Sequence, residues 1–456
     1  MKTWISAFAL LLLVSACGQD NQQATTNQKG DAAQTGAAQN GFKQAELDAI
    51  MDRYENDHEF MGSVAVAQAG KVIYTRAAGY RDYENKIKAT PDTKYRIGSV
   101  SKTFTALLAL MAVDEGKLSL DDSLAAYYPR VPNADKITIA HMLAHRSGLP
   151  SYTRDPEFKD IVFKGVTQDA MLKRFEGYEG QFPPGEKEDY SNTNIYLMTL
   201  ILERIYQKSY AQLITDKIAD PLKLKHTYYA KTLSADKNEA YSYHTKDKIT
   251  RAPAFHHSTM LGAGGLVSTP SELTQVYNAL FSDQIIKPET LARMIDIDQT
   301  FGLGIEKMTY TGRVSYGHRG RVAEFNSIVL YHEKEKISIA ISDNGSFGDM
   351  PAIIKDILGA YFKSDKVAIS IEDLDKFAGT YQAVKSSDDH SVFEREGHKL
   401  INVIKGEFRA ELVYKGNNSF LLDQSYAPAI TFVFSEDGQQ MTFKQRNSAF
   451  DYKKVK

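Results

Sequence analysis

The pattern of apolar residues in this 456-residue chain changes near residue 367. Between residues 42 and 363, stretches with helical and strand-like spacing alternate. Beyond residue 367, apolar and polar residues alternate in short runs. Turn signals such as Gly416-Asn417-Asn418 and Asp437-Gly438 separate these runs. Such alternation of every second residue, interrupted at short intervals by turn residues, is typical of small antiparallel β structures. The sequence therefore predicts two folded domains, 42–363 and 368–456.

For the second domain we expect a small antiparallel β barrel, with a sandwich as the alternative. Its predicted strands are 377–382, 391–396, 400–404, 408–414, 420–422, 429–434, 441–445 and 449–452.

The first domain is predicted to be α+β. Residues 62–80 have the pattern of a β hairpin, and 325–331 with 337–342 form a second one, followed by an amphipathic helix at 350–362. Residues 102–113 are apolar on every side of a helix, which indicates a buried helix. We therefore expect an antiparallel sheet, flanked by helices, in which both ends of the domain meet.

Cys17 is the chain's single cysteine, so neither an intrachain disulfide nor a cysteine-based metal cage can form. It follows Lys2 and an apolar run, residues 4–14, that is too short to span a bilayer but fits a secretory signal. Val14-Ser15-Ala16-Cys17 resembles a bacterial lipobox. The resemblance implies a lipoprotein signal peptide at 1–16 and lipidation of Cys17. A plain signal peptide cut nearby is the alternative.

Residues 17–41 are predicted to be a flexible tether, because they are polar and lack aromatic and branched aliphatic side chains. Gly18, rather than Asp, follows the cysteine, and by resemblance this favours the outer membrane. The expected location is therefore the cell envelope. The chain would be attached to the membrane through its N-terminal lipid and would face the periplasm.

The charge balance argues against nucleic-acid binding. The chain has 55 Lys and Arg against 57 Asp and Glu, a net charge of -2, which leaves no excess of cations to neutralise phosphates. It also has no Gly-x-Ser-x-Gly elbow and no phosphate-binding loop, which argues against an α/β-hydrolase or a nucleotide enzyme. We expect neither a metal nor another cofactor, and the sequence leaves the oligomeric state open.

A candidate nucleophile stands at the start of the buried helix. Ser99 and Lys102 are three residues apart, so in a helix their side chains lie on one face, a turn apart. A serine needs a neighbouring base, and a lysine in an apolar setting loses stability as an ammonium and can accept a proton. The alternative is a helix-capping serine beside a surface lysine.

Two further segments carry side chains suited to the same chemistry. Tyr190 can act as acid or base if nearby cations lower its pKa, and the Asn192 amide can orient a substrate carbonyl while bonding Lys102. Later, His318 and Gly320 would share a face of an extended segment, and the amide of Arg321 could pair with that of Ser99 as an oxyanion hole. Taken singly, a packed tyrosine and a structural histidine are the alternatives.

Residues 42–363 resemble the serine β-lactamase and penicillin-binding-protein superfamily, in particular the branch of class C β-lactamases, D-alanyl-D-alanine carboxypeptidases and esterases. The segments that carry the resemblance, in order, are Tyr95–Phe104 (YRIGSVSKTF), Ile137–Pro150 (ITIAHMLAHRSGLP), Tyr190–Asn192 (YSN), Ala263–Pro270 (AGGLVSTP) and His318–Gly320 (HRG).

The resemblance implies a serine β-lactamase-like sheet flanked by helices, beside a mostly helical region at about 117–260, with the site between them. It also implies that Ser99 forms an acyl-enzyme, that Lys102 and Tyr190 share proton transfer, and that Asn192 positions the substrate. His318 replaces the lysine of the Lys-Thr-Gly form, and an imidazole holds a carboxylate less firmly than an ammonium does. This replacement argues against strict peptide or β-lactam specificity.

Two further features receive structural interpretations. His141 and His145 are four apart, but no acidic residue stands between them as in a zinc motif, and ordinary helix packing is favoured. The second domain resembles the lipocalin-like modules attached to some members of this branch, and a packing or cleft-limiting role is favoured over ligand binding.

The predicted function is a serine hydrolase that acts on amides or esters in the cell envelope. Small molecules or short peptides are the expected substrates: D-amino-acid peptides, β-lactams or small esters. A carboxylesterase with little peptidase activity and a non-catalytic envelope protein that binds muropeptides or penicillin are the alternatives.

Overall fold

The computed structural model describes residues 44–56, 60–310, 312–345, 350–362, 369–386, 389–404, 408–422, 430–445 and 448–456. The predicted signal peptide (1–16), the lipidation site Cys17 and the tether (17–41) lie outside the described residues. Among the helices that are described, none combines the length and the apolar composition needed to cross a bilayer.

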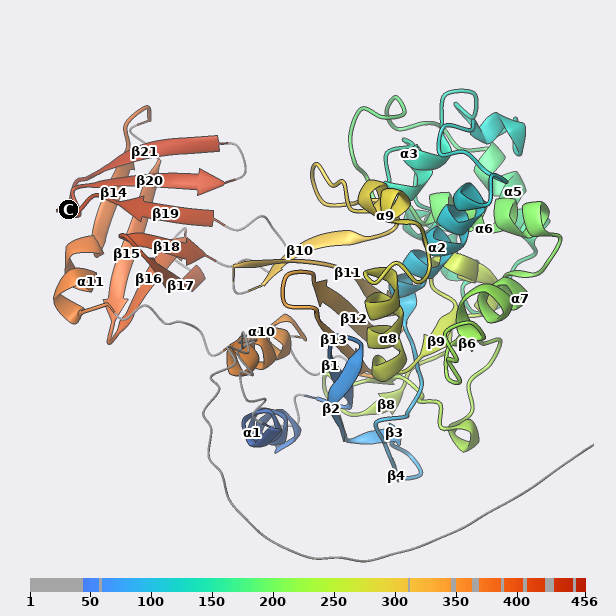
Figure 1. Cartoon of the computed structure of the whole chain (residues 1–456), viewed down its shortest axis with the longest axis horizontal. Helices are drawn as coiled ribbons and strands as arrows, with labels where there is room; N and C mark the ends of the chain where they lie inside the picture. The colour runs from blue at the N-terminus through green and yellow to red at the C-terminus, as the bar shows by residue number, and fades with distance from the viewer. Residues whose placement is uncertain are drawn as a thin grey trace, which may run out of the picture. The chain divides into compact units, whose positions relative to one another are not determined.

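The first domain contains a six-stranded antiparallel sheet in the order β10-β11-β12-β13-β1-β2 (Figure 1). Its strands are β10 (Glu306–Tyr310), β11 (Arg313–Val322), β12 (Phe325–His332), β13 (Ile337–Asp343), β1 (Gly62–Gln68) and β2 (Lys71–Ala78). Val64 of β1 lies opposite Ile341 of β13, so a strand from the start of the domain pairs with one near its end. The prediction that the two ends meet in one sheet is confirmed.

Helices cover both faces of this sheet because successive residues of its strands point to opposite sides. On β12, Ile328 and Leu330 pack with the helices α1 (Gln44–Asn56) and α10 (Met350–Phe362). Val329 and Tyr331 pack in the other cluster, together with α2 (Ser101–Asp114), α6 (Asn192–Tyr206) and α8 (Pro270–Leu280). The strands are thus apolar on both faces, and the predicted α+β class is confirmed.

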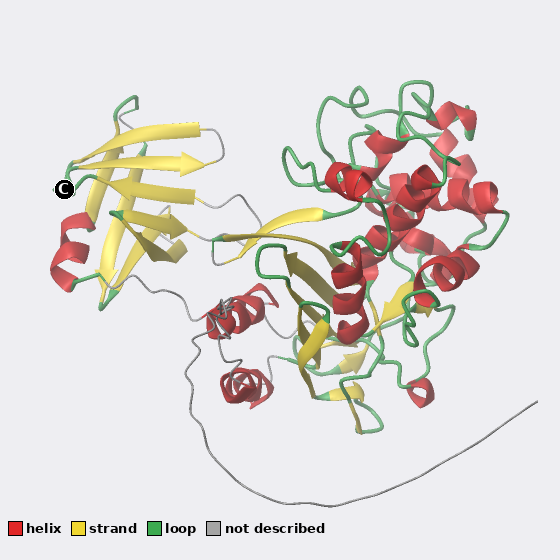
Figure 2. Cartoon of the chain, viewed as in Figure 1, coloured by secondary structure: helices red, strands yellow, loops and turns green. Residues whose placement is uncertain are grey.

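The segment between α2 and α8 forms the predicted helical region, in which short helices are joined by long loops (Figure 2). Its helices are α3 (Ile139–Leu143), α4 (Phe158–Ile161), α5 (Gln168–Glu176), α6 and α7 (Tyr210–Ile214), and α9 (Pro288–Met294) follows α8. The short strands form three small sheets, β3-β4, β5-β9-β6 and β7-β8. Their bounds are β3 (Tyr80–Asp82), β4 (Ile87–Lys88), β5 (Tyr95–Arg96), β6 (Tyr228–Tyr229), β7 (Tyr243–His244), β8 (Thr250–Arg251) and β9 (Leu266–Ser268).

The last eight strands form a closed antiparallel barrel, and the predicted barrel is confirmed. Its strands are β14 (Gly379–Ala383), β15 (His390–Glu396), β16 (Lys399–Ile404), β17 (Phe408–Gly416), β18 (Ser419–Leu422), β19 (Ile430–Phe434), β20 (Gln440–Gln445) and β21 (Ser448–Lys454). Tyr381 opposite Lys454 closes it. Rings such as Phe393 and Phe434, 5.1 Å apart, fill the interior.

One strand of the barrel was predicted to begin too early. Phe377 is the last residue of the helix α11 (Ile371–Phe377), and β14 begins only at Gly379. The Ser370 hydroxyl accepts a hydrogen bond from the backbone N–H of Asp373 at 3.0 Å and caps this helix. The apolar face of the helix then places Phe377 in the barrel core.

Candidate active site

The predicted nucleophile and base are in contact. Ser99 lies in the 3₁₀ turn Gly98–Val100, which runs directly into α2, so its side chain and that of Lys102 are one turn apart. Lys102 Nζ is 2.9 Å from Ser99 Oγ and donates a second hydrogen bond, of 2.5 Å, to the carbonyl of Ala263. Lys102 is completely buried, whereas Ser99 is partly exposed. The geometry excludes a surface lysine at this position.

Burial lowers the pKa of Lys102 to about 7, although the carboxylate of Glu306 acts in the opposite direction. A buried ammonium has lost the hydration that stabilises its charge, and two hydrogen bonds replace only part of it. Lys102 therefore exists as a neutral amine in a large share of molecules near neutral pH. A neutral amine in contact with a hydroxyl can take its proton.

Tyr190 completes the cluster from the loop before α6. Lys102 Nζ lies 5.1 Å from the centroid of its ring, and its hydroxyl interacts with Ser99. The condition that nearby cations lower the pKa of Tyr190 is not met: burial raises this pKa, and the Ser99 hydrogen bond and Arg319 oppose the rise only in part. Tyr190 therefore keeps its proton at neutral pH and is suited to donate it.

The free edge of β11 contacts the turn that carries Ser99. β10 pairs only as far as Gly317, which leaves the following residues of β11 open to this turn. A Cβ on Gly320 would lie 2.0 Å from the carbonyl oxygen of Ile97 and 2.9 Å from the amide nitrogen of Ser99. A Cβ on Gly98, whose φ is +50°, would lie 2.7 Å from the nitrogen of Arg321. The turn and β11 therefore touch through their backbones, a contact that only glycines at positions 98 and 320 permit. The amides of Ser99 and Arg321 lie at this contact.

Asn192 begins α6 and is partly exposed, and its expected hydrogen bond to Lys102 is not formed. Within the described residues, Lys102 uses the two acceptors named above, and the Asn192 amide nitrogen donates to the hydroxyls of Ser151 at 3.1 Å and Thr153 at 2.8 Å. Ser151 and Thr153, and not Lys102, therefore hold the Asn192 amide nitrogen.

His318 is buried on β11 and contacts a carboxylate that sequence reasoning did not identify. Its Nδ1 donates to the carbonyl of Arg319 at 2.6 Å and lies 3.3 Å from Glu306 Oε1. Glu306, the first residue of β10, is itself buried and accepts hydrogen bonds of 2.9 and 2.7 Å from the Arg319 guanidinium. Burial lowers the pKa of His318, opposed by Glu306, so the imidazole is neutral at neutral pH. The Arg321 guanidinium is 66% exposed and pairs with Glu324, so this residue faces the cluster through its backbone only.

His145 is a second residue whose place sequence reasoning missed. It was predicted to pack in a helix, but α3 ends at Leu143, and His145 has a left-handed backbone with φ of +56°. Its ring lies against that of Tyr190, 4.4 Å between centroids. His141 instead accepts a hydrogen bond from the amide of Thr138 and caps α3. Among the described residues no group of histidines and acids is arranged to hold a metal ion.

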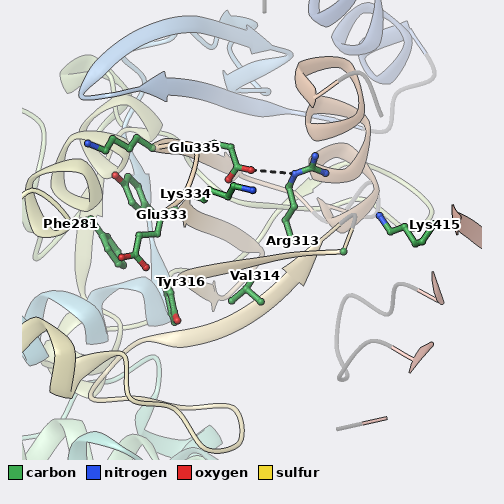
Figure 3. A pocket seen from close by; sticks show the side chains of 11 residues that line it. Phe281, Arg313, Val314, Tyr316, Glu333, Lys334, Glu335 and Lys415 are labelled. Atoms are coloured by element: carbon green, nitrogen blue, oxygen red, sulfur yellow. Dashed lines mark ion pairs between the residues drawn. The ribbon is translucent and has the colours of Figure 1, made fainter. Parts of the chain in front are cut away.

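An open hollow is lined by residues other than those of this cluster (Figure 3). Its volume is about 880 Å³, and it is lined by residues at the start of β11 and in the turn between β12 and β13, among them Tyr316 and Glu333. The ion pair between Arg313 and Glu335, 3.7 Å long, crosses it. None of the predicted site residues lines it, so it is not the site described above.

Comparison with known proteins identifies relatives that match about two thirds of this chain. The protein Flp of Staphylococcus aureus is 27% identical over 68% of this chain, a match that spans 65% of Flp. Teichoic acid D-alanine hydrolase of Staphylococcus aureus is 28% identical over 65% of this chain and 74% of its own length. The solved structure of D-amino acid amidase from Ochrobactrum anthropi, in complex with L-phenylalanine amide, has a TM-score of 0.61 and 26% identity over 70% of this chain and 97% of that one.

The match to the beta-lactamase family covers residues 47–361, which include β1, α2, α6 and the whole of β11. The segment before residue 47 and the barrel lie outside this match. The likeness thus extends over the sheet and over every side chain of the cluster around Ser99. By this match and by its fold, the chain belongs to the beta-lactamase family of serine hydrolases and penicillin-binding-protein-like proteins.

Proposed function

We propose that this protein is a serine hydrolase that cleaves amides or esters through an acyl-enzyme on Ser99. The observation that carries the proposal is the 2.9 Å contact between Ser99 Oγ and Lys102 Nζ, in which burial lowers the pKa of the lysine to about 7. A base with a pKa near the working pH combines a deprotonated fraction with enough basicity to accept a proton.

In the acylation step, Lys102 Nζ takes the proton of Ser99 as Oγ attacks the carbonyl carbon of the substrate. The negative charge that develops on the carbonyl oxygen is stabilised by the backbone N–H groups of Ser99 and Arg321. Tyr190 gives its proton to the leaving nitrogen or oxygen as the bond to the carbonyl carbon breaks, and the proton on Lys102 then returns to Tyr190. The leaving group departs as a neutral amine or alcohol.

Deacylation uses the same groups with water as the nucleophile. Water gives a proton to the base as its oxygen attacks the acyl carbon, and the same amides stabilise the second oxyanion. The bond to Ser99 Oγ breaks, Oγ recovers a proton, and the acid is released. Each proton taken in one step is returned in the next, so the cycle needs no cofactor.

As substrates we propose D-amino-acid amides, peptides or esters, or β-lactams, in the cell envelope. Two of the relatives are named D-amino acid amidase and teichoic acid D-alanine hydrolase. Their names support a substrate whose acyl group derives from a D-amino acid. The envelope location rests on the lipobox-like sequence that ends at Cys17. His318 in place of a lysine favours esters and simple amides over peptides that end in a carboxylate.

The test is intact-mass measurement after reaction with a fluorophosphonate and, separately, with a penicillin. We expect one fluorophosphonate adduct on the wild type and none on Ser99→Ala, while the exposed Ser282→Ala serves as the matched control and labels normally. Labelling of Ser99→Ala would refute the assignment. A stable penicillin adduct without turnover of any ester would favour the non-catalytic binding protein, and rapid ester cleavage without a penicillin adduct would favour the esterase.

A further inference from the structure

The hydrogen bonds of His318 determine which of its ring nitrogens carries the proton. Nδ1 lies 2.6 Å from the carbonyl oxygen of Arg319, which can only accept, so Nδ1 carries the hydrogen. Glu306 Oε1, at 3.3 Å from the same nitrogen, favours the same tautomer. Because the ring is neutral, the other nitrogen, Nε2, has a lone pair and acts as a hydrogen-bond acceptor.

This acceptor has no partner among the described residues, although His318 is only 1% exposed. It lies at the end of the ring away from Nδ1 and Glu306. The ring is 6.5 Å from that of Tyr190, and Gly320, next on the same face of β11, touches the Ser99 backbone. An unpartnered acceptor that is buried beside the nucleophile costs free energy unless a ligand satisfies it.

The cations near this acceptor are already engaged. Arg319 is bound by Glu306, Arg321 is at the surface with Glu324, and Lys102 donates to Ser99 and Ala263. A substrate carboxylate placed at His318 would meet a lone pair and, behind it, the Glu306 carboxylate. A protonated amine placed there would donate to Nε2 and be attracted by that carboxylate.

We infer that His318 Nε2, supported by Glu306, is an acceptor subsite for a protonated amine that the substrate carries close to its scissile carbonyl. This inference rests on the proposed function. The preferred substrates are then aminoacyl esters or amides with a free amine. Acyl-D-alanyl peptides and depsipeptides that end in a carboxylate are disfavoured. Glu306 is a positioning residue, because it acts through the tautomer of His318 and holds Arg319 away from the substrate.

The test compares kcat/KM at neutral pH for D-alanine methyl ester, N-acetyl-D-alanine methyl ester and the carboxylate-bearing ester N-acetyl-D-alanyl-D-lactate. We expect the free amine to be favoured over its acetylated form by about tenfold or more, as a charge-assisted hydrogen bond allows. His318→Lys should abolish this preference and raise the rate for the depsipeptide. Glu306→Gln should change both rates in the same directions, because it releases Arg319. The exposed His398→Lys is the matched control and should behave as the wild type.

Two outcomes separate this inference from the function on which it rests. If p-nitrophenyl acetate, a neutral ester, is hydrolysed in a Ser99-dependent way but the amine and its acetylated form react equally, the subsite is refuted and the hydrolase stands. If no ester is turned over through Ser99, the proposed function itself fails. Should Glu306→Gln fail to fold, as near-ultraviolet circular dichroism would show, His318→Lys and His318→Gln still measure the preference.

Discussion

The ring of His145 lies against the ring of Tyr190, 4.4 Å between centroids, and His145 also holds the backbone on both sides of that tyrosine. Its carbonyl accepts the N–H of Asp189 at 2.9 Å, and its Nδ1 accepts the N–H of Ser191 at 3.2 Å. Burial holds the pKa of His145 well below its usual value, so the ring stays neutral and Nδ1 remains an acceptor. His145 thus fixes the position of the phenol relative to Ser99.

We predict that His145→Asn keeps more activity than His145→Phe. Asparagine tolerates the left-handed backbone and offers an oxygen to the N–H of Ser191, whereas phenylalanine keeps only the ring. The loss should be mainly in kcat, by about 10- to 100-fold for phenylalanine, because proton transfer by Tyr190 requires its exact position. Steady-state kinetics with a neutral ester measure kcat and KM separately for each variant. Equal loss in both variants, or a change in KM alone, would contradict the positioning role.

The contact between β11 and the turn of Ser99 gives a second prediction. Gly320→Ala places a Cβ 2.0 Å from the carbonyl oxygen of Ile97, so strand and turn must separate and the amide of Arg321 moves away from Ser99. We expect a loss of about 100-fold or more in kcat/KM, the usual result of removing one oxyanion donor. Gly359→Ala is the control, because no atom lies near the added Cβ and alanine favours its helix, α10. Comparable losses in both variants would exclude the contact as the cause.

The fold could be predicted from the sequence because its signals are local or periodic. The alternation of residues such as Phe432 and Phe434 marks the barrel strands directly, and the apolar helix after Ser99 is recognisable from its composition. The pairing of Val64 with Ile341 followed only from the expectation that two hairpins share a sheet. The sequence pattern placed Phe377 in a strand because apolar and polar residues alternate around it. In the structure Ser370 caps a helix, α11, that includes Phe377.

The missed parts of the site depend on long-range geometry. Glu306 meets His318 and Arg319 because β10 stops pairing at Gly317, and no local pattern marks that end. The role of His145 depends on a left-handed residue beyond a helix end, and histidine spacing alone suggested packing. These positions are set by how strands end and loops turn, which a periodic pattern does not record.

Asp343 provides a prediction about stability and pH. It is buried at the end of β13, and burial raises its pKa to about 7, although the Asn326 amide and the Gly345 N–H donate to it. A carboxyl with a raised pKa binds its proton more tightly in the folded state. Its contribution to the free energy of unfolding is therefore fully present below about pH 4 and is lost as the pH rises through 7. Asp343→Asn should therefore raise the melting temperature by a few degrees at pH values above 7 and change it little in acid.

Thermal denaturation at acidic and mildly alkaline pH measures this difference. Asp247→Asn, at an exposed position, is the matched control and should leave the melting temperature unchanged at both values. A melting temperature of Asp343→Asn that falls above pH 7 would mean that the buried carboxylate is stabilising.

Lys102 links activity to stability. Its folded pKa of about 7 lies below the ordinary lysine value of 10.5, so the folded state binds fewer protons between these values and stability rises with pH across that window. Below pH 7 the cost of burying the charge is complete, on the order of a few kcal/mol. Lys102→Met fills the same space without a charge, so it should melt at a higher temperature at neutral pH. The exposed Lys248→Met should not.

The same substitution should abolish fluorophosphonate labelling, because the base is removed while the fold is kept. In the wild type, kcat/KM for a neutral ester should rise about tenfold per pH unit below 7 and become level above it, as Lys102 loses its proton. Labelling and a pH titration of initial rates measure the two effects. Labelling that persists in Lys102→Met, or a flat pH profile in the wild type, would assign the base to another group, whereas both expected results would place the proton of Ser99 on this amine.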